Sequence, residues 1–221
     1  MISISLRQAF AVPEVTVSKN TDGSFNASDV LIFRKEISSS ERANTVDMLY
    51  TMWPPSQVNI LTHSVFMISV SIILRQGVTT TVGLSVRSQG SPAVYKNVAQ
   101  GKDFAMPIEE CGNMLVMVLS YTQHTGDHSL ITTYFNLLGQ WADYLVANAL
   151  SPPDQLSSDA FAGSLVNQTN LAIKGIIGIS GMSEIAKMSF ATSYVSQFQT
   201  LAISTVGKHL TLSYGNDSRY V

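Results

Sequence analysis

Apolar residues recur at helical spacing through much of the second half of the chain. Residues 109–124 and 128–149 each keep one apolar face, at the i, i+3, i+4 and i+7 positions typical of an amphipathic helix. Between these runs, Gly126 is a typical helix stop and Asp127 a typical N-cap. The pattern predicts two antiparallel helices joined by a tight turn. The positions predicted to face the core are Leu115, Val118, Tyr134, Leu137, Trp141 and Leu145.

Two further helices are predicted toward the C-terminus. Residues 193–202 form the shorter one, and the longer one covers residues 167–187 with Gly175, Gly178 and Gly181 at three-residue spacing. A glycine inside a helix costs up to about 1 kcal/mol, so three of them indicate a buried face that another helix approaches closely. Helix pairs in series, joined alternately by tight turns and long loops, are typical of a toroid of αα-hairpins.

The first half of the chain has a weaker pattern. Residues 3–11 are predicted to be helical, and residues 29–38 read as a strand that follows a turn at residues 20–24. Residues 45–75 are apolar, but their mixed β-branched pattern fits a helix and a strand equally well. The fold class predicted from the pattern is mainly α, with a short β segment near the N-terminus.

The composition narrows the partners of the chain. Its 221 residues are 45% hydrophobic and only 13% charged, and the formal net charge is −2. About 25% charged residues is usual, so the surface is expected to be rich in uncharged polar groups. Lys and Arg form no cluster along the chain, which argues against a nucleic-acid or anionic-membrane partner.

Cys111 is the only cysteine, so no disulfide can form within the chain, and a buried apolar role is expected for its thiol. The first ten residues, MISISLRQAF, lack the basic and apolar regions of a signal peptide. The most apolar run, residues 65–74, is half of the roughly 20 residues that span a bilayer. The chain is therefore expected to be soluble, with no membrane partner.

Several segments resemble the central domain of the fungal glutaminase A family. The matching segments are FRKEISSSERANTVDMLY, MPIEECGNMLVMVLSYTQHTGD, QWADYLVANAL, FAGSLVNQTNLAIKGIIGISGMSEIA and TLSYG. The resemblance implies a partial α/α toroid of the six-hairpin, glycosidase-like type, preceded in the family by a β-rich domain. It also implies a secreted enzyme that releases ammonia from glutamine and uses no cofactor.

The chain departs from the family pattern in three ways. It is much shorter, so it is expected to be a fragment, and Ala160 stands where the family tends to have a second acid beside Asp159. No Asp or Glu lies between Asp47 and Asp103, a stretch of 55 residues, which indicates a divergent or frame-shifted middle. The predicted divisions are an N-terminal segment 1–50, the divergent stretch 51–106 and the hairpin domain 107–221.

The resemblance also directs the search for a site. In a toroid whose helices alternate between inner and outer, the helices that begin near residues 109 and 167 are both inner, and their N-termini lie at one mouth. Paired carboxylates at that mouth can act as general acid and base on a water molecule, although two acids at a helix start also simply complement its dipole. The predicted catalytic residues are Glu109, Glu110 and Asp159, and the predicted substrate-binding residues are Asn167, Gln168 and Asn170.

Other patterns favour structural explanations. His124, Asp127 and His128 sit at the hairpin turn without an evident further ligand, so a metal site is not predicted. Lys174 could reach the mouth or extend from an apolar face toward solvent, and the second interpretation is favoured. Asn167 lies in a glycosylation sequon but is expected to be too buried for modification.

Three functional hypotheses stay open. The first is a glutaminase-like hydrolase acting on a small substrate, glutamine, with carboxylates at the mouth of the toroid. The second is a glycoside hydrolase or carbohydrate-binding module of the same fold. The third is an inactive fragment of an enzyme family. Paired carboxylates serve amide and glycoside hydrolysis alike, so the sequence does not separate the first two. By the resemblance, the protein is expected to be extracellular.

Overall fold

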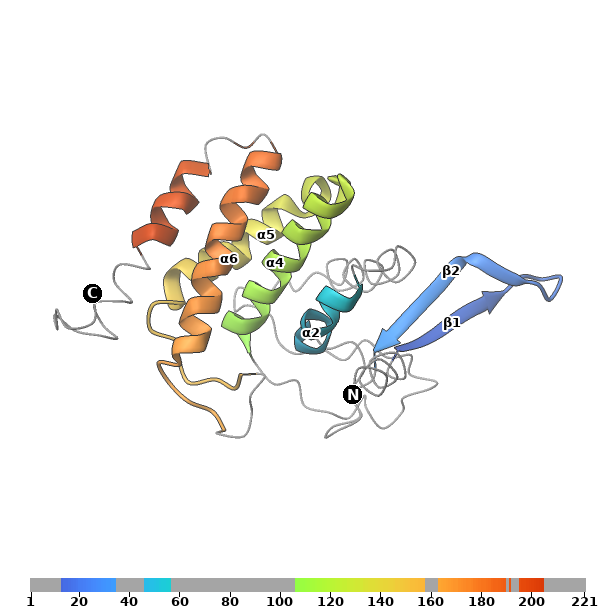
Figure 1. Cartoon of the computed structure of the whole chain (residues 1–221), viewed down its shortest axis with the longest axis horizontal. Coiled ribbons are helices and arrows are strands. Elements are labelled where there is room, and N and C mark those ends of the chain that lie inside the picture. The colour runs from blue at the N-terminus through green and yellow to red at the C-terminus, as the bar shows by residue number, and fades with distance from the viewer. Residues whose placement is uncertain are drawn as a thin grey trace. The chain divides into compact units, whose positions relative to one another are not determined.

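The computed structural model describes residues 13–34, 46–56, 106–157, 163–189, 191 and 195–204. These residues are mostly helical, with one two-stranded sheet near the N-terminus, so the predicted fold class is confirmed (Figure 1). The described residues up to 56 belong to one compact unit, and those from 106 onward belong to a second. The helix predicted at residues 3–11 and most of the stretch 51–106 lie outside the described residues.

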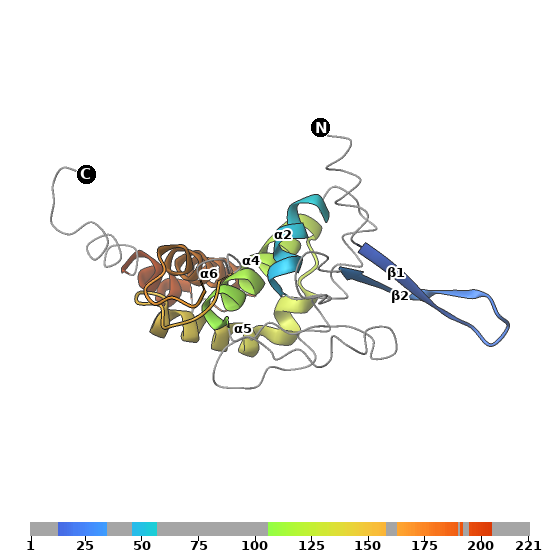
Figure 2. The same cartoon turned by 90° about the horizontal axis from the view of Figure 1, so that it is seen from below.

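The N-terminal unit contains a β-hairpin. Strand β1 (Pro13–Lys19) pairs antiparallel with β2 (Phe25–Arg34), as Figure 2 shows. The predicted turn at residues 20–24 is confirmed: the N–H of Asn20 donates to the carbonyl of Ser24 over 2.8 Å, and Gly23 has a φ of +85° that only glycine adopts easily. The strand predicted at 29–38 begins earlier, at Phe25, because pairing with β1 continues to the turn. The sequence pattern did not predict β1.

The same unit contains helix α2, which runs from Val46 to Ser56. Its buried side chains, Val46, Leu49 and Trp53, follow the i, i+3, i+7 spacing of a helix face. The ambiguous apolar stretch 45–75 is therefore helical over its first part. The rest of that stretch lies outside the described residues.

The predicted helical hairpin is confirmed. Helix α4 (Pro107–Thr125) is followed by α5 (Ser129–Asn148), close to the predicted 109–124 and 128–149. Gly126 ends α4 with a left-handed φ of 72°, and its N–H donates to the carbonyl of Thr122 over 2.9 Å. His128, rather than Asp127, is the N-cap residue of α5. Asp127, one residue before the N-cap, still caps the helix start, since its Oδ1 accepts a hydrogen bond from the N–H of Ser129 over 2.9 Å.

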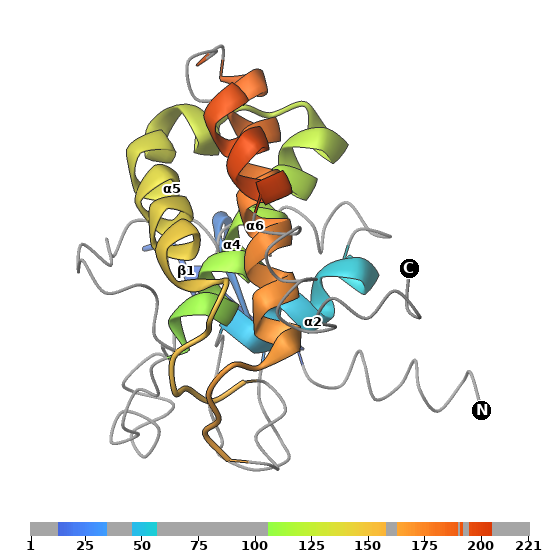
Figure 3. The same ribbon diagram turned by 90° about the vertical axis from the view of Figure 1, so that its left-hand side faces the viewer.

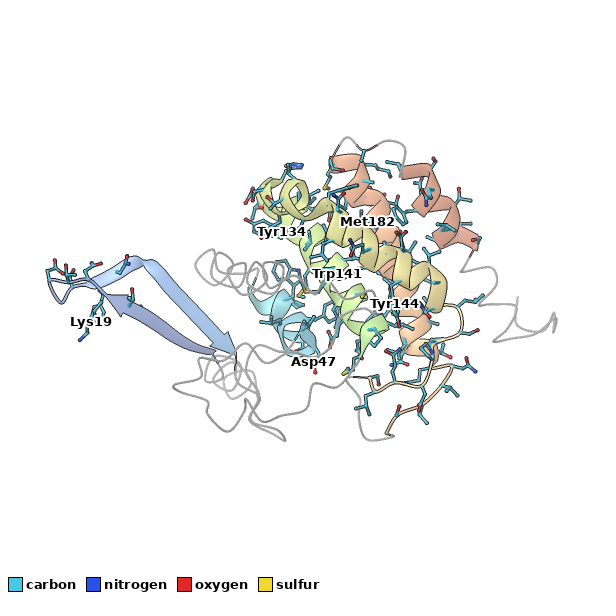
Figure 4. All side chains as sticks on the ribbon, turned by 180° about the vertical axis from the view of Figure 1, so that it is seen from behind. Lys19, Asp47, Tyr134, Trp141, Tyr144 and Met182 are labelled. Atoms are coloured by element: carbon cyan, nitrogen blue, oxygen red, sulfur yellow. The ribbon has the colours of Figure 1, made fainter. Side chains whose placement is uncertain are left out.

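The apolar face of α5 differs from the predicted one. Trp141 and Leu145 are buried as predicted, but Tyr134 and Leu137 are only half-buried. The core instead takes Ile131 and Leu138. A kink at Tyr134, where φ is −115° and ψ is 15°, takes that residue out of the straight stripe. After the kink, Leu138 begins the buried face, since Trp141, Ala142 and Leu145 follow it at i+3, i+4 and i+7. Tyr134, Trp141 and Tyr144 are labelled along α5 in Figure 4.

Helix α6 (Thr169–Met188) packs closely on both preceding helices (Figure 3). A Cβ at Gly175 would overlap the Cβ of Ala149, and a Cβ at Gly178 would lie 2.8 Å from Leu145 Cδ1 and 3.0 Å from the Cα of Gly112. The close approach predicted from the glycine spacing is therefore confirmed at Gly175 and Gly178. At Gly181 there is room, because an added Cβ would meet its nearest neighbour at 3.7 Å.

Alanine at two of these glycines is expected to change stability in opposite directions. Gly175→Ala should lower the free energy of unfolding by about 1–3 kcal/mol, because the Ala149 methyl has no freedom to move away. Gly181→Ala should raise it by up to about 1 kcal/mol, because the helix gains propensity without a clash. Urea unfolding of both variants measures the difference. Equal effects in the two variants would show that the close packing of α6 on its neighbours does not require glycine at position 175.

Asp127 is expected to make the stability of the hairpin depend on pH. Hydrogen bonds from Tyr121 and Ser129 lower the pKa of Asp127, and burial followed by the bond to Asp127 raises the pKa of Tyr121 to about 12. Because the folded pKa of Asp127 is the lower one, its contribution is complete above the ordinary value of about 3.9 and disappears as pH falls through the lowered pKa.

Asp127→Ala should therefore cost about 1 kcal/mol at neutral pH, as the loss of a helix cap does. The difference from the unaltered protein should vanish in acid, which thermal unfolding across pH 2–7 measures. Asp143→Ala, which removes an exposed acid from the middle of α5, is the control. A pH-independent difference for the Asp127 variant would contradict the assignment.

A final helix covers residues 195–204, close to the predicted 193–202. Phe198 and Ala202 are buried on it.

Within the described ranges, no helix has both the length and the apolar character that a membrane span requires.

Candidate functional site

Helix α4 opens with two buried glutamates. Glu109 is 3% exposed and Glu110 is fully buried, although both lie in the first turn, where backbone N–H groups have no partner within the helix. The positive end of the helix dipole favours acids there. Burial of a carboxylate still costs free energy unless other groups pair with it, so the partners of the two side chains define the site.

Glu109 pairs with a lysine from α6. The ammonium Nζ of Lys174 lies 2.8 Å from Oε1 of Glu109. Gly112 permits this approach, because a Cβ at that position would lie 2.8 Å from Lys174 Cγ and 3.0 Å from its carbonyl oxygen. Of the two interpretations of Lys174, the favoured one, extension toward solvent, was wrong, since its side chain is only 23% exposed and ends on the carboxylate of Glu109.

Glu110 contacts an amide one turn further along α4. Nδ2 of Asn113 donates to Oε2 of Glu110 over 3.0 Å, and this bond fixes the orientation of the Asn113 amide. Oδ1 of Asn113 is buried and accepts no hydrogen bond from any described residue. The two adjacent glutamates therefore have different partners, an ammonium for Glu109 and a neutral amide for Glu110.

The loop after α5 closes over the start of α4. Oε1 of Gln155 accepts from the backbone N–H of Ile108 over 3.3 Å, in a buried position. The backbone of Gln155 exchanges two hydrogen bonds with Leu165, and its carbonyl also accepts from Nε2 of Gln168 over 2.8 Å. Residues 155, 165 and 168 thus hold the loop against the helix end that carries the two glutamates.

Helices α4 and α6 start at the same end of their unit. An added Cβ at Gly175 would contact Ile108, one at Gly178 would contact Gly112, and one at Gly181 would contact Leu119, so position increases along both helices together. Figure 1 shows both helices rising from the lower end of the view. Glu109 and the start of α6 thus lie at the same end of the unit, as the alternation of inner and outer helices predicted. Asp159 lies outside the described residues, and its convergence with the glutamates stays a prediction.

The three predicted binding residues beside α6 lie at its beginning. The helix starts at Thr169, two residues later than predicted, and Asn167 precedes it with a φ of 54°. Asn167 is exposed, so the expectation that it is buried was wrong; its N–H donates to the carbonyl of Pro152 over 2.8 Å. Gln168 is half-buried and holds the loop, while Asn170 is exposed.

Sequence reasoning did not select Gln155 and Asn113 for the site, and for Lys174 it favoured a solvent-facing role over one at the mouth. Asn113 had a usable signal, because an amide three residues after a glutamate on a helix is placed to bond with it. Gln155 had none, because its contact with Ile108 joins residues 47 positions apart through a loop without periodicity.

The described residues offer no group of three His, Cys, Asp or Glu side chains that is able to hold a metal ion. His124, Asp127 and His128 are all exposed at the hairpin turn.

Cys111 is fully buried, as expected for a small apolar side chain. Burial, followed by the proximity of Cys111, raises the pKa of Tyr144 on α5.

The family model and the relatives that match this chain all carry the name glutaminase. The profile of the glutaminase A six helical-hairpin domain matches residues 1–221, including the stretch with no acidic residue. Glutaminase A of Aspergillus oryzae is 34% identical over 96% of the chain, and a probable glutaminase of Arthroderma benhamiae is 27% identical over 88%. The chain covers 32% and 30% of these two proteins, about a third of their length. No solved structure matches the chain significantly.

Proposed function

We propose that this chain, which belongs to the glutaminase A six-helical-hairpin family, forms part of a hydrolase that converts L-glutamine to L-glutamate and ammonia. The observation that supports the proposal most directly is the pair of buried glutamates at the start of α4, with the Lys174 ammonium 2.8 Å from one of them. Burial of two adjacent carboxylates at a helix start costs stability that exposed capping acids would not cost, which favours a role beyond capping.

Hydrolysis of an amide needs two proton transfers. One group takes a proton from the attacking water, and another delivers a proton to the departing nitrogen. Glu109 and Glu110 supply two carboxyl groups from adjacent residues, each oriented by a different partner. Asp159 is proposed as the opposing acid across the cleft, at the separation of roughly 6.5–9.5 Å that leaves room for a water molecule in inverting hydrolases.

Charge complementarity fits an amino-acid substrate. Free glutamine carries a carboxylate and an ammonium group beside its amide. The Lys174 ammonium, which is partly exposed, is a counter-ion for the carboxylate, and the glutamates offer negative charge for the ammonium. Asn167, Gln168 and Asn170, at the start of α6, are proposed to bind the polar groups of the substrate, with Gln168 acting through the loop that it holds.

The experiment that tests this function measures two products from the full-length protein that carries this chain. Ammonia release from L-glutamine is expected, and release of reducing sugar from oligosaccharides is not. Sugar release without ammonia release would favour the alternative, a glycoside hydrolase or sugar-binding module with the same pair of acids. The 221-residue chain alone is expected to be weakly active or inactive, because it covers about a third of its relatives.

An extracellular location is also proposed, on the resemblance to secreted enzymes. The triplets Asn26-Ala27-Ser28 and Asn216-Asp217-Ser218 provide markers away from the proposed binding residues, because such triplets are glycosylated only on a secretory route. A loss of mass at Asn26 or Asn216 after enzymatic removal of N-glycans, seen by mass spectrometry of the native protein, is expected. Recovery of the protein only from the cytosol would contradict this location.

A further inference from the structure

We infer that Gln155 is a substrate-binding residue, whose side-chain Nε2 donates a hydrogen bond to the carbonyl oxygen of the substrate amide. The inference rests on the proposed hydrolysis of glutamine and adds a donor for the oxygen that becomes negatively charged. Three features of the residue carry it: its burial, the fixed orientation of its amide and the absence of an acceptor for Nε2 among the described residues.

Gln155 is 4% exposed, so its amide has little access to bulk water. Its Oε1 accepts from the N–H of Ile108, and only the oxygen of an amide accepts, so the amide orientation is fixed by that bond. Nε2, a donor with two hydrogens, then remains buried without an acceptor among the described residues. Most buried polar atoms in proteins have a partner, and an exception calls for a reason.

The position of this donor supplies the reason. Gln155 binds the residue that directly precedes Glu109, so its amide lies at the same helix end as both glutamates. Its backbone is held by the two bonds to Leu165 and the bond from Gln168, so the side chain starts from a fixed point. A rigid, buried donor beside catalytic acids is the arrangement that stabilises an oxyanion most strongly.

The chemical step places the donor as follows. The water oxygen bonds to the amide carbon, a carboxylate takes the water proton, and the carbonyl π electrons move to the oxygen. The Nε2–H of Gln155 stabilises that oxyanion. The carbonyl then reforms, the carbon–nitrogen bond breaks, and the nitrogen leaves as ammonia with a proton delivered by a carboxyl group. One water and one amide are consumed, and one carboxylic acid and one ammonia are formed.

Two variants of the full-length protein test the assignment. Gln155→Glu keeps an acceptor for Ile108 and loses the donor, and Gln155→Met keeps the size of the side chain, loses the donor and adds no charge. Both are expected to lower kcat for glutamine by about 10²–10³-fold, as the loss of an oxyanion donor does. Gln140→Glu makes the same chemical change on an exposed face of α5 and should leave kcat unchanged.

The outcomes separate this inference from the proposed function. If the unaltered protein releases ammonia and either Gln155 variant keeps its kcat, the inference is overturned and the proposed function stands. If the unaltered protein releases no ammonia, the proposed function fails. A crystal structure with L-glutamate then decides about Gln155: a ligand oxygen within hydrogen-bond distance of Nε2 supports the site, and a water molecule alone overturns it.

Discussion

Replacement of Glu109 or Glu110 by glutamine is expected to lower the rate of glutamine hydrolysis by about 10²–10⁴-fold in the full-length protein, the usual contribution of a general acid or base. Each change keeps the size of the side chain and removes its ability to accept or deliver the proton. Ammonia release at saturating glutamine measures the effect. Glu184→Gln, which alters an exposed glutamate paired with Lys187 on α6, is the matched control and should keep full activity.

A stability measurement separates chemistry from structure at Glu109. Removal of one partner of a buried ion pair leaves the other charge without compensation and is destabilising. Glu109→Gln removes the carboxylate that pairs with Lys174, whereas the double variant Glu109→Gln/Lys174→Met removes both charges of the pair and should recover much of the stability. Activity should remain lost in the double variant. If activity returns together with stability, Glu109 is a structural residue only.

The helical hairpin was predictable because its information is local. An apolar residue every three or four positions and a glycine followed by an aspartate specify two helices and the turn between them. Gly126 and Asp127 both act at that turn, although the cap position itself moved to His128. The kink at Tyr134 was not predictable, because no proline or glycine marks it, and it takes Tyr134 out of the straight stripe that the pattern predicts.

The candidate site was only partly predictable. The two glutamates were selected because two adjacent acids at a helix start form a local pattern. Their partners come from a distance: Lys174 lies 65 positions from Glu109, and Gln155 lies 47 positions from Ile108. Such contacts depend on how the helices and the loop pack together. Glycines in a helix predict that another helix packs closely on it, but they do not predict which polar side chain reaches across that contact.

Gly112 illustrates this limit. In the sequence it is a single glycine within a helical pattern, which lowers helix propensity and predicts no specific contact. In the structure it lies under the stem of Lys174 and against Gly178, so it lets the lysine cross α4 to reach Glu109. A packing residue thus determines the electrostatic partner of a proposed catalytic residue, which no local pattern expresses.

Trp141→Ala is expected to lower the free energy of unfolding by about 3–5 kcal/mol, the range for removal of a large buried aromatic side chain. Trp141, labelled in Figure 4, is 3% exposed on α5. Leu138 and Leu145, three residues before it and four after it, are buried as well. Its Nε1 is buried and donates to no acceptor in the described part of the chain, so the side chain contributes through packing. Urea unfolding followed by circular dichroism measures the change.

Trp141→Phe is the matched control for that assignment. Phenylalanine keeps most of the aromatic volume and removes an N–H group that has no acceptor among the described residues, so the expected cost is below about 1.5 kcal/mol. Because Trp53 is also buried, the emission of Trp141 is read in a Trp53→Phe background and should be blue-shifted. If the phenylalanine variant is as unstable as the alanine variant, Nε1 makes an essential hydrogen bond. If the emission of Trp141 is red-shifted, Trp141 lies outside the core of the hairpin that supports Glu109 and Glu110.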